Sequence, residues 1–91
     1  MKAGIAINLQ TKLEEIEENV LKEADFFIVM AIVTGFPRQK FDDKALEKVK
    51  MLRKMFPEKD IIADGGVKAE NLIKIKKSGA TGVVIGSGIF D

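Results

Sequence analysis

Apolar and polar positions along the chain follow two patterns in turn. Four short apolar runs, each typical of a buried strand, lie at Gly4–Ile7, Phe26–Ile32, Ile61–Ala63 and Val83–Ile85. Apolar residues at helical spacing lie between them, from about Thr11 to Glu23, from Asp42 or Asp43 to Phe56, and from Ala69 to Ile75. The order β-α-β-α-β-α-β, four strands and three main helices, predicts an α/β fold with parallel strands and right-handed crossovers.

Local signals refine these elements. Thr11 and Glu14 have the spacing of a capping box, which predicts one amphipathic helix that begins there. The continuous apolar run Phe26–Ile32 predicts a strand that is buried on both faces. Gly79 follows the third helical stretch and is expected to end it in the left-handed conformation.

Composition excludes several classes of function. The chain has 91 residues, which predicts a single domain spanning residues 1–91, and its net charge of +1 gives no footprint for nucleic acid. No apolar run approaches the roughly 18 residues of a membrane-spanning helix, and we expect a cytoplasmic protein. There is no Cys and no His, so any chemistry has to use carboxylates, amines, hydroxyls and backbone amides.

The stretch Asp64-Gly65-Gly66 is the strongest candidate site. Its carboxylate follows a predicted buried strand, and parallel α/β folds place their chemistry at that end of the strands. The two glycines allow close approach of the backbone to an anion, as do Gly86-Ser87 after the fourth strand. Two simpler interpretations stay open: a carboxylate that caps the next helix, and glycines that only form tight turns.

Three stretches resemble the ribulose-phosphate 3-epimerase family, and specifically the second half of its TIM barrel. The sequence VMAIVTGFPRQKF at residues 29–41 is similar to the family's sixth strand and loop. Gly4–Asn8 is similar to the fifth strand. DGGV at residues 64–67 and SGATGVVIGSGIF at residues 78–90 are similar to the seventh and eighth strands. The resemblance implies a half-barrel of parallel strands.

The resemblance also implies roles for individual residues. Asp64 would be a ligand of a divalent, zinc-type metal and the acid/base that moves a proton next to the carbonyl of ribulose 5-phosphate. Met30 would line the site. Backbone groups would hold the substrate phosphate at Gly35, Phe36, Pro37, Arg38, Gly65, Gly66, Gly86 and Ser87. From the residues alone, Met30 is more often a core residue than a substrate contact, and Arg38 is a solvated loop charge.

The chain also departs from the family pattern. It has no counterpart of the family's second catalytic aspartate or of its two metal-binding histidines, and Pro37 lacks an N–H to donate. The chain could therefore be an epimerase-like protein that is incomplete as a catalyst alone. The alternatives are a non-catalytic phosphosugar-binding protein and a structural half-barrel. Unpaired strand edges predict a partner, either a second copy in a homodimer or a complementary half-barrel chain.

Overall fold

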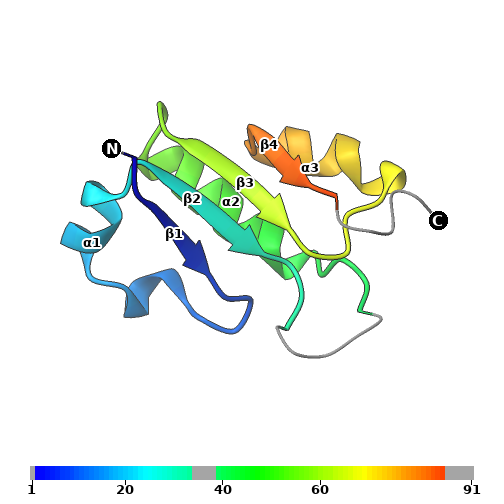
Figure 1. Ribbon diagram of the computed structural model, residues 1–91, viewed down its shortest axis with the longest axis horizontal. Coiled ribbons are helices and arrows are strands. Elements are labelled where there is room, and N and C mark those ends of the chain that lie inside the picture. The colour runs from blue at the N-terminus through cyan, green and yellow to red at the C-terminus, as the bar shows by residue number, and fades with distance from the viewer. Residues whose placement is uncertain (1, 34–38, 86–91) are drawn as a thin grey trace.

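The computed structural model describes residues 2–33 and 39–85. It contains one parallel sheet with the strand order β1-β2-β3-β4 (Figure 1). The strands are β1 (Gly4–Ile7), β2 (Phe26–Met30), β3 (Asp60–Asp64) and β4 (Gly82–Val84). Each lies in or next to one of the predicted apolar runs, so the α/β half-barrel arrangement expected from the sequence is confirmed.

Three α-helices connect the strands: α1 (Glu18–Glu23), α2 (Lys44–Met55) and α3 (Leu72–Ser78). Short 3₁₀ turns precede two of them, η1 (Leu13–Glu15) and η2 (Ala69–Asn71). In Figure 1, α2 passes behind β2 and β3, and α3 lies behind β4. None of the helices in the described part of the chain is long and apolar enough to cross a membrane.

The prediction of one continuous helix from Thr11 to Glu23 is wrong. Ile16 has an extended backbone (φ −97°, ψ 130°), which separates η1 from α1, and no side chain caps the start of η1. The acidic run Glu14–Glu18 offers a reason, because like charges three and four residues apart destabilise a helix. Leu13 of η1 lies in the core, and Ile16, in the extended link between η1 and α1, packs against it.

The two faces of the sheet differ, which corrects the prediction that β2 is buried on both. Phe27 and Val29 are fully buried under the helices, whereas Phe26, Ile28 and Met30 are only half-buried. Side chains alternate along a strand, and register therefore aligns three rows across the open face. The rows are Gly4, Phe26 and Asp60; Ala6, Ile28, Ile62 and Gly82; and Met30, Asp64 and Val84.

Lys59, the residue before β3, links the β2–β3 connection to the end of α1 in the β1–β2 connection. Its Nζ donates to the carbonyls of Leu21 (3.0 Å) and Lys22 (2.7 Å), which lie in the last turn of α1. The same ammonium lies 4.4 Å from the ring centroid of Phe56. That ring packs against Phe27, with 5.4 Å between centroids. A cation therefore caps a short helix and contacts the aromatic core at the same time.

The end of α3 agrees with its sequence signal. Gly79 has φ 112°, the left-handed conformation that was predicted for the helix end. A Cβ at Gly79 would lie 2.8 Å from Cγ of Arg53, whose Nε donates to the Gly79 carbonyl at 2.9 Å. The glycine thus also allows α2 and α3 to approach each other closely.

Candidate functional site

Asp64 is the last residue of β3, and its side chain belongs to the open face of the sheet. Its neighbours Ala63 and Ile61 point the other way and are completely buried. Register places Met30 of β2 and Val84 of β4 beside Asp64 in one row. Asp64 is half-buried, so its carboxylate lies at an accessible strand end between two apolar side chains.

The turn after Asp64 has two positions, 65 and 66, whose backbone conformation and close packing suit only glycine. Gly65 has φ 108° and Gly66 has φ 67°, the left-handed values that tight glycine turns use. A Cβ on Gly65 would lie 2.7 Å from Cγ1 of Ile32, and one on Gly66 would lie 2.6 Å from the backbone N of Phe41. Packing therefore requires both glycines, because one lies against the segment that leaves β2 and the other against the segment that leads into α2. This holds whether or not the turn binds a ligand.

Those two segments form a pair of arms around the turn. The leaving arm is residues 31–33 and the returning arm is residues 39–42. The backbone N–H of Ala31 donates to the Asp64 carbonyl at 2.7 Å, and that of Asp42 donates to the Ala31 carbonyl at 2.9 Å. The Asp42 carboxylate in turn accepts the Lys44 N–H at 2.9 Å, where α2 begins. Hydrogen bonds thus connect the Asp64 strand end to the start of α2.

Gln39 links the arms farther out. The N–H of Val33 donates to Oε1 of Gln39 at 2.8 Å, and Nε2 of Gln39 donates back to the Val33 carbonyl. Gln39 was not among the predicted site residues. It lies in the stretch 29–41 that resembles the family's sixth strand and loop, but neither that resemblance nor the surrounding glycine and proline indicates what its side chain contacts.

Four predicted site residues thus lie together in the structure: Met30, Asp64, Gly65 and Gly66. The remaining predicted residues lie outside the described residues. They are Gly35, Phe36, Pro37, Arg38, Gly86 and Ser87. Their assignment to a phosphate site stays a prediction.

The donor set around Asp64 does not fit a metal ion by itself. Within residues 2–33 and 39–85, no three carboxylates lie close enough to hold a cation. The whole chain has no His and no Cys. A protein zinc site takes three or four such ligands, so Asp64 can supply one ligand and the others would have to come from outside the described residues.

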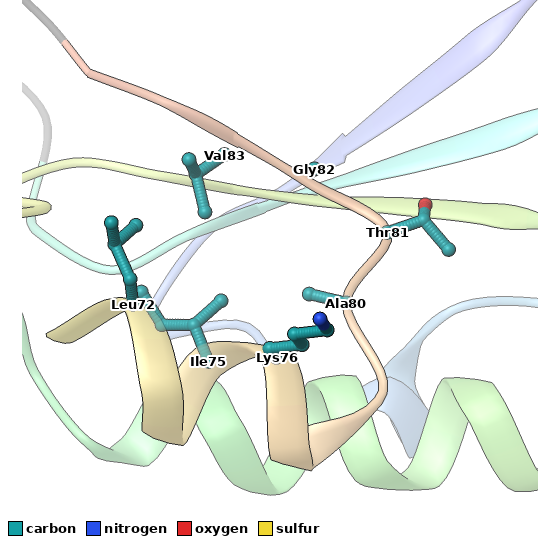
Figure 2. Close-up of a pocket in the computed structure, with 7 residues that line it drawn as sticks. All are labelled: Leu72, Ile75, Lys76, Ala80, Thr81, Gly82 and Val83. Atoms are coloured by element: carbon teal, nitrogen blue, oxygen red, sulfur yellow. The ribbon is translucent and has the colours of Figure 1, made fainter.

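A separate cleft lies on the helix side of the sheet, between α3 and β4 (Figure 2). It has a volume of about 440 Å³ and is lined by Leu72, Ile75, Lys76, Ala80, Thr81, Gly82 and Val83. The Oγ1 of Thr81 already accepts the N–H of Ile61 at 2.9 Å. The lining is otherwise mostly apolar and includes none of the predicted site residues, so this cleft is distinct from the Asp64 end of the sheet.

Comparison with known proteins gives a consistent answer. Residues 1–90 match the ribulose-phosphate 3 epimerase family. A ribulose-phosphate 3-epimerase of Aquifex aeolicus is 40% identical over 98% of this chain and 41% of its own length. A chloroplastic ribulose-5-phosphate-3-epimerase of Arabidopsis thaliana is 39% identical over 98% of the chain and 33% of its own length.

A ribulose-phosphate 3-epimerase of Oryza sativa subsp. japonica, named as the cytoplasmic isoform, is 36% identical over 99% of the chain and 40% of its own length. The chain therefore spans between a third and about two fifths of the length of these curated relatives. The activity that their names state belongs to those longer proteins.

Proposed function

This chain belongs to the ribulose-phosphate 3-epimerase family, and we propose that Asp64 is the acid/base of proton transfer on a sugar phosphate. The observation that carries the proposal is the position of Asp64. It lies at the C-terminal end of β3, on the open face of the sheet, directly before two glycines with positive φ. Parallel α/β folds bind and convert ligands at this end of their strands.

Asp64 would act on the C–H bond next to the substrate carbonyl. Its carboxylate takes the proton from the carbon next to the carbonyl of the sugar phosphate, and the electron pair of that C–H bond moves into an enediolate. Return of a proton to the opposite face of the same carbon gives the epimer. This second transfer needs another acid on the other face, and register places Met30 and Val84 beside Asp64. The second acid would therefore come from a partner or from residues outside the described part of the chain.

The substrate would be held by its phosphate, and ribulose 5-phosphate is the compound we propose. Backbone N–H groups of Gly65 and Gly66 are suited to an anion, because left-handed turns gather amides into a concave site. Gly35, Phe36, Arg38, Gly86 and Ser87 would complete the phosphate site, and Pro37 would contribute no N–H. Met30 would pack against the carbon skeleton.

A partner would complete both the fold and the site. The open face carries apolar side chains, namely Ala6, Phe26, Ile28, Met30, Ile62 and Val84. Within the described residues, β1 and β4 each pair with a strand on one side only. We favour a homodimer that closes an eight-stranded barrel, with a complementary half-barrel chain as the alternative; residues 1–91 would be one half-barrel domain. Light scattering should give twice the mass of one chain, and a clean monomer would exclude the dimer.

A divalent metal would need more ligands than Asp64. Asp64 would be one of them, and the rest would come from a partner or from outside the described residues. For location, we propose the cytoplasm, supported by a relative named as a cytoplasmic isoform.

An epimerase assay of the full chain, with and without an added divalent metal, tests the catalytic proposal. Asp64→Asn should lower turnover of ribulose 5-phosphate about 100-fold or more, the usual contribution of a positioned acid/base. Asp60→Asn is the matched control, because Asp60 lies on the same strand and face at its other end. Equal turnover by the two variants would remove Asp64 from catalysis.

Two observations favour a second function, a phosphosugar-binding or structural half-barrel without turnover. The chain has no His, and Asp64 stands in its row without a second carboxylate. This alternative predicts that the wild-type chain binds phosphate or ribulose 5-phosphate without converting it. Titration followed by NMR, together with the turnover assay, distinguishes the two.

A further inference from the structure

We propose that Gln39 is a positioning residue whose side-chain amide holds the Asp64-Gly65-Gly66 turn in place by tying together the two arms around it. The proposal rests on the proposed function, in which that turn binds the substrate phosphate. Its structural part can be tested without any ligand.

The amide pair itself is the first step. Val33 N–H donates to Oε1 of Gln39 at 2.8 Å, and Nε2 of Gln39 donates to the Val33 carbonyl. Both backbone groups of one residue are thus satisfied by one planar side chain, as they would be by a neighbouring strand. Both residues are half-buried, so unpaired groups there would be poorly compensated by water.

The second step is the contact of both arms with the turn. Ile32 is next to Val33 in the leaving arm. A Cβ on Gly65 would lie 2.7 Å from Cγ1 of Ile32. The Gln39 carbonyl and the Phe41 N–H lie 3.1 and 2.6 Å from the Cβ position of Gly66. Each glycine therefore touches one arm. A movement of either arm would release the turn on that side.

A second bridge, made by backbone hydrogen bonds, joins the two arms at their end nearest β2 and β3. The N–H of Asp42 donates to the Ala31 carbonyl, and Ala31 donates to the Asp64 carbonyl. The inner bridge uses backbone alone and is available to any sequence. The outer bridge needs a donor and an acceptor on one side chain of this length, which Gln has and which ionised Glu, Lys and Met lack.

The variant Gln39→Glu tests this requirement. Above the pKa of the introduced carboxyl, it accepts the Val33 N–H but cannot donate to the Val33 carbonyl. Below it, the protonated carboxyl can do both, as the amide does. Gln10→Glu is the matched control, because it makes the same change at an exposed residue just after β1.

Amide hydrogen exchange followed by NMR is the ligand-free readout. At pH 7, Gln39→Glu should lower the protection of the Val33, Gly65 and Gly66 amides about tenfold relative to Gln10→Glu, with partial recovery near pH 4. In the wild type, the side-chain NH₂ of Gln39 should exchange more slowly than that of Gln10. That comparison needs no variant and decides the amide pair even if Gln39→Glu does not fold.

Titration with inorganic phosphate is the functional readout. If the wild type binds phosphate, Gln39→Glu should bind it about tenfold more weakly than Gln10→Glu at pH 7, with the gap narrowing at low pH. Unchanged protection at Gly65 and Gly66, or unchanged phosphate affinity, would overturn the positioning role. A wild type that binds no phosphate would instead count against the proposed function, and the exchange data would still decide the role of Gln39.

Discussion

Gly66 is the position where the structure makes its sharpest energetic prediction. The substitution Gly66→Ala adds one methyl group to a residue at φ 67°. Its Cβ would lie 2.6 Å from the Phe41 backbone N and 2.9 Å from the Lys40 carbonyl carbon. Both neighbours are backbone atoms, so no side-chain rotation can relieve the contact.

The cost has two parts. The left-handed conformation costs an alanine about 1–2 kcal/mol. Forcing a methyl group into a closely packed site costs about 1–3 kcal/mol more. The free energy of unfolding should therefore fall by about 2–5 kcal/mol, a large share of the roughly 5–15 kcal/mol that is usual for a domain.

Gly82→Ala is the matched control. The φ of Gly82 is not positive, and a Cβ there would lie 3.7 Å from Cγ1 of Ile62, an ordinary contact. The same methyl group should change stability by less than about 1 kcal/mol, with a small gain from the stiffer unfolded chain.

Urea unfolding followed by circular dichroism measures the difference. With a slope of about 1–3 kcal/mol per molar, the midpoint of Gly66→Ala should lie about 1 M or more below that of Gly82→Ala. Equal midpoints would refute the packing of the Gly65–Gly66 turn against the returning arm. Gln39 could then not position the turn through the returning arm.

Two further predictions concern lysines. Lys59→Met should lower the free energy of unfolding by about 1–3 kcal/mol in the same urea assay, because it removes the cap on the Leu21 and Lys22 carbonyls and the contact with Phe56. Lys50 is exposed, so the control Lys50→Met should have little effect. Equal losses in the two variants would contradict the cap. Desolvation lowers the pKa of Lys48 from 10.5 despite the opposing attraction of Asp42, so the unfolded chain binds that proton more tightly. The free energy of unfolding should therefore rise as the pH increases from the folded-state pKa towards 10.5. Urea titrations at several pH values should show that rise flattened in Lys48→Met, and an unchanged slope would contradict it.

Several features could be predicted from local sequence because local physics decides them. Apolar runs bounded by polar residues determined all four strands, and Gly79 determined the end of α3. The placement of Asp64 at a strand end followed from its position after Ile61–Ala63. The positive φ of Gly65 and Gly66 followed from the residue type in a turn.

Other features depend on contacts between residues far apart in the sequence. The capping-box spacing at Thr11 predicted a helix start, but the sequence alone did not show that the helix would be interrupted at Ile16, which packs against the core from an extended link. The run Phe26–Ile32 is apolar throughout, and its composition does not distinguish the face that α2 covers from the open face. Only the packed helices decide which side is buried.

The candidate site divides in the same way. The sequence by itself determined an acid followed by two flexible residues at the end of a strand. The tertiary structure decided what those residues touch: Met30 and Val84 beside Asp64, the two arms against Gly65 and Gly66, and Gln39 bridging the arms. The reason is physical, since backbone preferences act within a few residues, whereas these contacts form only when crossovers bring separate strand ends to one edge of the sheet.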